Sequence, residues 1–457
     1  MHSTVKEQVP APHWPFGHHH LLAFFDTLLA QLEATTLPAT PGPGQPAQLS
    51  LRHLWVAYLA GVLRGVDSLA DVWRIVAWEQ LVGHAALSLT YMAVRQRLLR
   101  LGTAPFAQLF VALSTLLLAR QPSTGSELAP FAREVVVLDE TSLERVRQLT
   151  SDLRQEPADS EQRLVGKLAG LFDVRRQLWR RLELRHDALA NCKVNVLLLL
   201  EGLPTGSLIL ADLGYFSFAW FDYLSQQGYY WVSRLRQGTS FHIERVLSQD
   251  GQTLDALIWL GAHRADRAAS LVRLVQFRRG GHLHQYLTNV LDPEQLSLAE
   301  IVRLYARRWD IELAFKALKG ICGLHLWWSA VPTLVLQQLW MALLLFQLLQ
   351  ALRLAVATHA QVDPDDVSLD ILAKLLAQPS SQAAPLIPLL VERGITLKLI
   401  RPARRRPLIV PALLPENWLA VSHPLPPPRR ARYAQRKCRP PSVRLTRPPR
   451  FSHQLLL

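Results

Sequence analysis

Two aspartates stand directly after runs of apolar residues that are typical of buried strands. Asp139 follows Val-Val-Val-Leu at 135–138, and Asp212 follows Leu-Ile-Leu-Ala at 208–211. In open α/β sheets, ligands bind at the carboxyl ends of the strands, so acids at these two positions can converge on one site. The competing interpretation is a pair of solvated turn aspartates.

A second set of polar side chains recurs at helical spacing between residues 304 and 320. At ~100° per residue, one face of such a helix collects Tyr305, Arg308, Glu312, Lys316 and Lys319. Three cations, a phenol and one carboxylate suit a phosphodiester. The carboxylate would hold a metal ion, the cations would grip phosphates, and the phenol would donate a hydrogen bond. The alternative is a salt-bridged helix face with Glu312 paired to cations four residues before and after it.

Hydrophobic periodicity predicts the elements that position these groups. Residues 134–138, 193–200, 207–211 and 229–235 are predicted strands, and 216–227 is a predicted helix, which together make an α/β unit. Further strands are expected within 241–290, with Arg-Gly-Gly-His at 279–282 as a hairpin turn. The chain is then helical at 297–320 and again from Leu334. A strand-rich block at about 236–292 therefore interrupts an α/β domain before its late helix.

The region before residue 121 has a helical pattern, broken by a Pro/Gly-rich linker at 37–48. Two of its predicted helices, 68–80 and 87–101, are separated by a turn at Gly83, and the second bears Arg95, Arg97 and Arg100. This order is compatible with a helix-turn-helix that binds DNA. It is equally compatible with a helical bundle that has a solvated basic face.

Composition excludes several classes of protein. With 457 residues, 49% of them hydrophobic and 19% charged, the chain is neither disordered nor a small disulfide-stapled scaffold. Three cysteines without a C-x-x-C pair favour a reducing compartment, and the polar first fourteen residues do not read as a signal peptide. No G-x-x-x-x-G-K-[ST] phosphate loop occurs, which argues against ATP-driven chemistry.

The most membrane-like stretch of the sequence is 334–356. Gln337, Gln338, Gln347, Gln350 and Arg353 interrupt it, whereas a bilayer span needs ~20 predominantly apolar residues. A buried helix of a soluble protein is therefore the prediction.

The positive charge is concentrated at the C-terminus. The net charge is +14, and residues 401–457 hold thirteen of the fifty Lys and Arg residues but one of the thirty-six acids. The same stretch contains twelve of the thirty prolines, which predicts an extended basic arm. Such an arm suits a polyanion, either nucleic acid or an anionic membrane surface.

Four residues of the helix stripe, Tyr305, Arg308, Glu312 and Lys319, form the pattern Y-x2-R-x3-E-x6-K. This pattern resembles the signature of the insertion-sequence-four family of bacterial DDE transposases. Supporting matches are Val-Leu-Asp-Glu-Thr-Ser at 137–142, Asp-Leu-Gly-Tyr-Phe at 212–216, Tyr-Leu-Thr-Asn-Val-Leu-Asp at 286–292, and Tyr-Ala-Arg-Arg-Trp-Asp-Ile-Glu at 305–312. The resemblance covers roughly residues 130–355. One departure is Glu140, where many members have a small residue.

The resemblance implies an α/β fold: an RNase H-like catalytic core with a β-strand-rich insertion before the glutamate helix, preceded by an all-helical N-terminal region. It implies that Asp139, Asp212 and Glu312 are the catalytic, metal-binding triad. Tyr305, Arg308 and Lys319 would contact transposon-end DNA, and Lys316 joins them from the stripe. Carboxylate ligands suit Mg²⁺, with Mn²⁺ as a substitute, and two such ions ~3.5–4 Å apart serve in-line displacement at phosphorus.

The expected organisation is a helical DNA-binding region at 1–125, a catalytic domain at 130–360, a helical segment at 361–400 and the basic tail at 401–457. The expected function is that of a transposase that cleaves element ends and joins them to target double-stranded DNA. It would act as a homodimer on paired ends, in the cytoplasm at the nucleoid, with no membrane partner. The alternatives are a DNA-binding relative that has lost catalysis and a membrane-associated basic protein with a span at 334–356.

Overall fold

The computed structural model describes residues 21–35, 48–120, 128–146, 154–157, 160, 163, 165–185, 196–250, 253–261, 267–279, 282–378 and 385–402. The predicted linker at 37–48 falls almost wholly outside this part of the chain, and so does the basic tail apart from Arg401 and Pro402.

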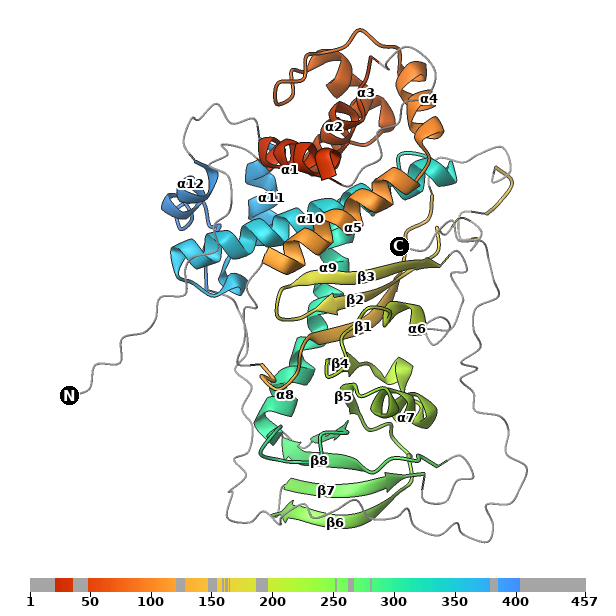
Figure 1. Ribbon diagram of the computed structural model, residues 1–457, viewed down its shortest axis with the longest axis vertical. Helices are drawn as coiled ribbons and strands as arrows, with labels where there is room; N and C mark the ends of the chain where they lie inside the picture. The colour runs from red at the N-terminus through yellow and green to blue at the C-terminus, as the bar shows by residue number, and fades with distance from the viewer. Residues whose placement is uncertain are drawn as a thin grey trace, which may run out of the picture.

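The described strands form one nine-stranded sheet in the order β3-β2-β1-β4-β5-β9-β8-β7-β6 (Figure 1). Their bounds are β1 Val135–Ser142, β2 Lys167–Asp173, β3 Leu178–Arg185, β4 Leu208–Ala211, β5 Tyr230–Arg234, β6 Phe241–Gln249, β7 Thr253–Leu260, β8 Val272–Arg279 and β9 His282–Thr288. Strands β1, β4 and β5 run parallel, and every other pairing is antiparallel.

Helices precede, interrupt and follow the sheet. The α-helices are α1 Leu21–Thr35, α2 Leu51–Arg64, α3 Leu69–Trp78, α4 Tyr91–Leu101, α5 Ala104–Arg120, α6 Val196–Leu199, α7 Phe218–Gln226, α8 Leu298–Arg307, α9 Trp309–Gly320, α10 Pro332–Ala360, α11 Leu369–Ala377 and α12 Leu386–Glu392. Two short 3₁₀ helices are η3 Leu213–Tyr215 and η4 Pro364–Asp366. The mixed α/β class and the helical N-terminal region are thereby confirmed.

The parallel strands are buried on both faces, as their apolar runs require. Side chains alternate along a strand, so Val135 and Val137 of β1 enter one hydrophobic cluster, with the N-terminal helices and α8–α10, while Val136 and Leu138 enter another, with α6 and α7. The sheet is therefore a layer between two sets of helices. The alternation of side chains along β1 decides which of its residues face each set.

Strands β6–β9 extend the same sheet and form the strand-rich block expected at about 236–292. Val232 of β5 pairs with Thr288 of β9, and the expected hairpin turn is confirmed by the pairing of Arg279 with His282. A buried ion pair ties this block to the next helix: Arg273 donates to both carboxylate oxygens of Asp255, and its third nitrogen donates to the Leu296 carbonyl just before α8. The block is thus coupled to the helices that carry the site.

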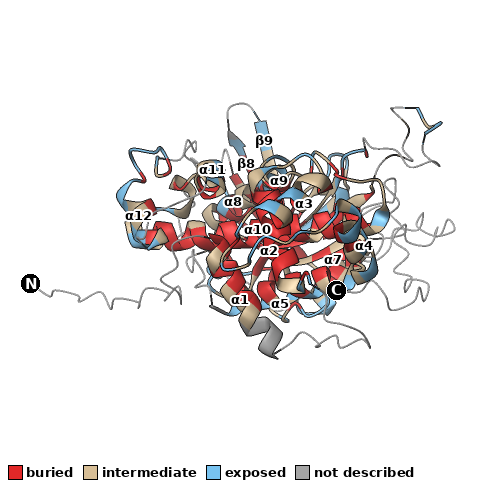
Figure 2. Cartoon of the chain, turned by 90° about the horizontal axis from the view of Figure 1, so that it is seen from above, coloured by how far each residue is buried: buried red, intermediate tan, exposed pale blue. Residues whose placement is uncertain are grey.

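The long helix α10 crosses the middle of the molecule and is buried over most of its length (Figure 2). The glutamines that interrupt its apolar sequence make hydrogen bonds inside the protein. Gln337 donates to the Leu98 and Gly102 carbonyls, and Gln347 bonds both backbone groups of Trp179. The prediction of a buried helix is confirmed.

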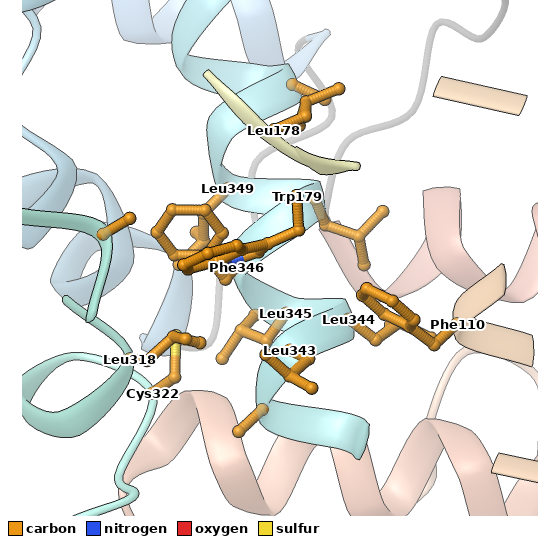
Figure 3. Close-up of a cluster of buried hydrophobic side chains, with 14 of the residues drawn as sticks. Phe110, Leu178, Trp179, Leu318, Cys322, Leu343, Leu344, Leu345, Phe346 and Leu349 are labelled. Carbon is orange, nitrogen blue, oxygen red and sulfur yellow. The ribbon is translucent and has the colours of Figure 1, made fainter. Parts of the chain in front are cut away.

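In length and hydropathy α10 could cross a membrane, and the bent pair α4–α5 passes the same test if counted as one span; 89% of the apolar window of α10 is buried in the protein. Figure 3 shows the surrounding core, where Phe346 and Leu349 of α10 lie beside Trp179 of β3, and Leu318 of α9 lies beside Cys322.

Two sequence predictions are wrong in detail. The predicted strand at 193–200 is a helical turn, α6, over its described part, because periodicity cannot separate a short apolar run in a strand from one in a helix. The helix predicted through 297–320 is divided at Arg308 into α8 and α9. Strands β2 and β3 were not expected at all; β2 pairs with β1, and β3 pairs with β2 at the edge of the sheet.

Candidate active site

Asp139 and Asp212 lie side by side where two parallel strands stop pairing. The parallel register of β1 and β4 ends with Leu138 opposite Ala211, so each aspartate is the next residue along its strand. In each strand, the residues two and four positions before the aspartate belong to the hydrophobic cluster that includes α9. Because every second residue of a strand points to the same face, both carboxylates point to the face covered by α9. The strand-end rule therefore placed both acids correctly.

Packing behind the strands sets the distance of α9 from the aspartates. Asp139 pairs with Gly170 of β2, where an added Cβ would lie 2.5 Å from the Trp179 ring. Trp179 in turn contacts Phe315 of α9, with ring centroids 4.9 Å apart. Because only glycine leaves room for this tryptophan, Gly170 helps to hold the glutamate helix against the sheet.

Arg308, at the junction of α8 and α9, brings the third acid to the same place. Its Nη2 lies 2.8 Å from Glu312 Oε1, its Nη1 3.7 Å from Asp139 Oδ2, and its Nε 3.9 Å from Asp212 Oδ1. The arginine side chain is 7% exposed. The structure thus brings together all three predicted triad acids, around one guanidinium that the sequence assigned to DNA.

The acids interact electrostatically. Burial raises the pKa of Asp139 to about 6, the negative charges of Asp212 and Glu312 add to the rise, and the Glu140 N–H and Arg308 oppose it. Burial works against the charged form of Arg308, but the adjacent carboxylates raise its pKa above the ordinary value. The cluster is therefore an electronegative site that stabilises a cation.

Tyr305 and the lysines of the stripe occupy different surroundings. Tyr305 is buried with its ring 5.2 Å from that of Tyr286, and within the described residues its hydroxyl has no hydrogen-bond partner. Burial raises the pKa of this phenol, so it is an O–H donor. Lys319 lies 3.5 Å from Glu144, while Lys316 is exposed on α9. The predicted stripe therefore begins in the interior, at Tyr305, and ends at the surface, at the two lysines.

Glu140, where many family members have a small residue, points away from the acid cluster. Glu140 follows Asp139 on β1, so its side chain points to the opposite face of the sheet. There it pairs with Lys167 of β2 at 2.9 Å and with Arg185 of β3 at 3.2 Å. The larger residue therefore leaves the acid cluster intact.

Two cations at this edge were missed by the sequence reasoning. Arg234 ends β5, the third parallel strand, and is close enough to Tyr305 and Tyr286 to oppose the rise in their pKa values. Arg236 lies two residues on, donates to the Leu213 carbonyl and sits 5.0 Å from the Phe216 ring. Applying the strand-end rule to cations as well as acids would have found Arg234.

The three carboxylates offer the oxygen ligands that Mg²⁺ prefers. Among the described residues, however, no group of three His, Cys, Asp or Glu side chains is close enough together to hold a metal ion as arranged. The reason is visible in the geometry, since Arg308 lies between the acids. The donor set fits a divalent cation provided that the guanidinium moves aside.

Comparison with known proteins shows what this chain is similar to. Residues 130–348 match the family model of the transposase DDE domain. The chain is 28% identical over 173 residues to the transposase InsG for insertion sequence element IS4 of Escherichia coli, covering 35% of this chain and 38% of the relative. A piggyBac transposase synaptic complex with hairpin DNA aligns with 85% of this chain and 83% of its own at 9% identity, but a TM-score of 0.40 is too low to establish a shared fold.

The match to the family model makes residues 130–348 similar to a transposase DDE domain. The similarity to the IS4 transposase agrees with the resemblance to the insertion-sequence-four family that the Y-R-E-K pattern indicated. The matched part corresponds to well under two thirds of the length of the curated relative.

Proposed function

We propose that this chain is the transposase of an insertion sequence, which binds the element ends and catalyses Mg²⁺-dependent strand cleavage and strand transfer. The observation that carries the proposal is that Asp139, Asp212 and Glu312 all lie around the buried guanidinium of Arg308, at the carboxyl edge of the parallel strands. The antiparallel β3-β2-β1 edge followed by parallel β4 and β5 supports an RNase H-like core, with β6–β9 as its insertion.

In this proposal the triad residues hold the divalent cations through their carboxylates. Bound cations would activate the attacking oxygen and neutralise the leaving oxygen in an in-line displacement. Asp139 is fixed for ligation by the Glu140 N–H, which donates to its Oδ1 at 2.8 Å. Asp212 and Glu312 are more exposed, which leaves them open toward the substrate side.

The cations around the triad would position the phosphodiester. Arg308, Lys316 and Lys319 come from α9 and its junction with α8, and Arg234 comes from the end of β5. Guanidinium groups bind phosphate through paired hydrogen bonds, and lysine acts as a point charge. Tyr305 would add an O–H donor, which would give its buried hydroxyl a partner.

The test is to identify the inverted repeats expected beside the gene and to measure cleavage of a duplex that carries them. We expect the full chain with Mg²⁺ or Mn²⁺ to produce a 3′-OH at the element end and to join it to a second duplex. The same duplex with scrambled repeats is the control. Tight, sequence-specific binding without cleavage under either metal would instead support a DNA-binding relative that has lost catalysis.

The remaining parts of the chain are assigned by the same reasoning. The helices α1–α5 of the 1–125 region would bind DNA, with Arg95, Arg97 and Arg100 on the α4 side of the α3–α4 pair. Cleaving two ends in one reaction requires two active sites, so a homodimer on paired ends is proposed. Because the proposed substrate is chromosomal DNA, the protein would act in the cytoplasm at the nucleoid.

Removing the basic tail is expected to weaken DNA binding without changing its specificity. Its thirteen cations can neutralise phosphates, but a proline-rich arm offers no fixed geometry for reading base edges. Each phosphate contact contributes ~0.9 to the log–log salt slope. Full-length protein and a 1–400 truncation should therefore discriminate element ends from random DNA by similar ratios, with weaker binding and a shallower slope for the truncation.

The measurement is a salt titration of both proteins on both DNAs. Thermal unfolding of the truncation checks that the folded core persists. If truncation removed the preference for element ends and left the affinity for random DNA unchanged, the tail would be a specificity element and the electrostatic assignment would be wrong.

A further inference from the structure

The position of Arg308 is unusual for a residue assigned to DNA. Its guanidinium faces three carboxylates, yet only the contact with Glu312, at 2.8 Å, is short enough for a hydrogen bond. The contacts with Asp139 and Asp212, at 3.7 and 3.9 Å, are ion pairs at longer range. Arg308 therefore offsets the negative charge of the three carboxylates, although its contacts with Asp139 and Asp212 are too long for hydrogen bonds.

The surroundings of Arg308 favour its role as the local counter-ion. Lys319, at the other end of α9, pairs with Glu144 rather than with the acid cluster. The Arg308 guanidinium lies 4.8 Å from the Trp309 ring, and a cation–π contact of this kind stabilises a cation. One arginine thus supplies the positive charge nearest to three acids.

Arg308 cannot serve the acids and a phosphate at the same time. A phosphate offers a guanidinium two well-oriented acceptors, which is a better geometry than two ion pairs beyond hydrogen-bond distance. When Arg308 turns to DNA, three carboxylates are left without their cation. Closely placed like charges are unfavourable, so the vacated cluster gains affinity for a divalent cation.

We propose that Arg308 is an internal counter-ion, and that its transfer from the carboxylates to a DNA phosphate makes DNA binding and divalent-cation binding cooperative. The inference rests on the proposed function, because it takes the three acids as metal ligands. In this inference the three acids bind divalent cations weakly until DNA binds. The protein therefore cleaves little DNA unless it is bound to an element end. By linkage, the cation must strengthen DNA binding by the same factor.

The experiment measures Mn²⁺ binding to the full chain from the loss of the free-Mn²⁺ signal in electron paramagnetic resonance, with and without a short duplex carrying the element end. The same duplex with Asp139→Asn protein corrects for Mn²⁺ held by the DNA. An ion pair of this kind is worth about a tenfold change in binding or more. We therefore expect DNA to tighten Mn²⁺ binding to the wild-type protein by about tenfold or more.

Arg308→Gln should bind Mn²⁺ about tenfold more tightly than wild type without DNA, and should lose the DNA effect. Arg303→Gln is the matched control, because it removes a positive charge from the exposed surface of α8 and should behave as wild type. Arg308→Lys keeps the charge but cannot span three carboxylates, so it should fall between the two. Its behaviour tests the inference even if the glutamine variant does not fold.

The outcomes separate the inference from the function on which it rests. If Mn²⁺ binds wild type in an Asp139-dependent way, but neither Arg308 variant binds it more tightly without DNA, the counter-ion role is wrong and the proposed metal site stands. If wild type binds no Mn²⁺ beyond the Asp139→Asn level with or without DNA, the metal-dependent function fails and the inference fails with it.

Discussion

Changing any one of the three clustered acids to its amide is expected to reduce Mg²⁺-dependent strand cleavage by ~10³-fold or more. The variants are Asp139→Asn, Asp212→Asn and Glu312→Gln. A bound divalent cation provides several kcal/mol of charge stabilisation in the transition state, and each ~1.4 kcal/mol corresponds to a factor of ten in rate. Without divalent cations, binding to element ends should be retained, because these side chains are placed to hold metal rather than phosphate.

The measurement is the rate of 3′-OH formation on end-bearing duplex under single-turnover conditions, with end binding followed by fluorescence anisotropy. Glu144→Gln is the matched control: it also removes a carboxylate near α9, but one that pairs with Lys319 outside the cluster. We expect that control to cleave at a rate close to wild type. Cleavage at the wild-type rate by any of the three cluster variants would refute the triad assignment for that residue.

Breaking the buried ion pair between β7 and β8 is expected to destabilise the fold strongly. Arg273 and Asp255 are 0% and 1% exposed, and the arginine also holds the Leu296 carbonyl ahead of α8. Asp255→Ala leaves the guanidinium without its counter-ion in a dry interior, which costs ~3–5 kcal/mol of unfolding free energy. Urea denaturation followed by tryptophan fluorescence measures the loss.

A surface pair provides the comparison for that prediction. Lys374 and Asp370 lie 2.7 Å apart on α11 but are both largely exposed, so Asp370→Ala should cost at most ~0.5 kcal/mol. The double variant Asp255→Leu with Arg273→Met should recover much of the loss, since replacing both buried charges by apolar groups removes the unpaired one. Equal effects of Asp255→Ala and Asp370→Ala would show that the Arg273 pair does not stabilise the sheet.

The sequence determined most of what is local. Apolar runs marked β1, β4 and β5, and the residues that follow the first two runs are Asp139 and Asp212, which lie together because the carboxyl ends of parallel strands meet at one edge. The five-residue stripe marked the helix of Glu312. The glutamines of α10 marked a helix inside protein rather than in lipid, and each of the two described above bonds backbone groups there.

Several elements were decided by contacts between distant parts of the chain. The β2 strand carries Gly170 because the Trp179 ring needs its space, a requirement that no pattern in the β2 sequence displays. The four-residue turn α6 has the composition of a strand, and its tertiary environment selects the helix. Pairing across β5 and β9 joined the strand-rich block to the core sheet, and strand order depends on such long-range register.

The role of Arg308 shows the limit most clearly. Helical spacing alone allowed two assignments, a phosphate contact or an i,i+4 pair with Glu312, because it places only residues of the same helix. The structure forms the pair and adds Asp139 and Asp212 from two strands more than ninety residues earlier in the chain. A cation among three acids is a property of their arrangement in space, so only the tertiary structure could reveal it.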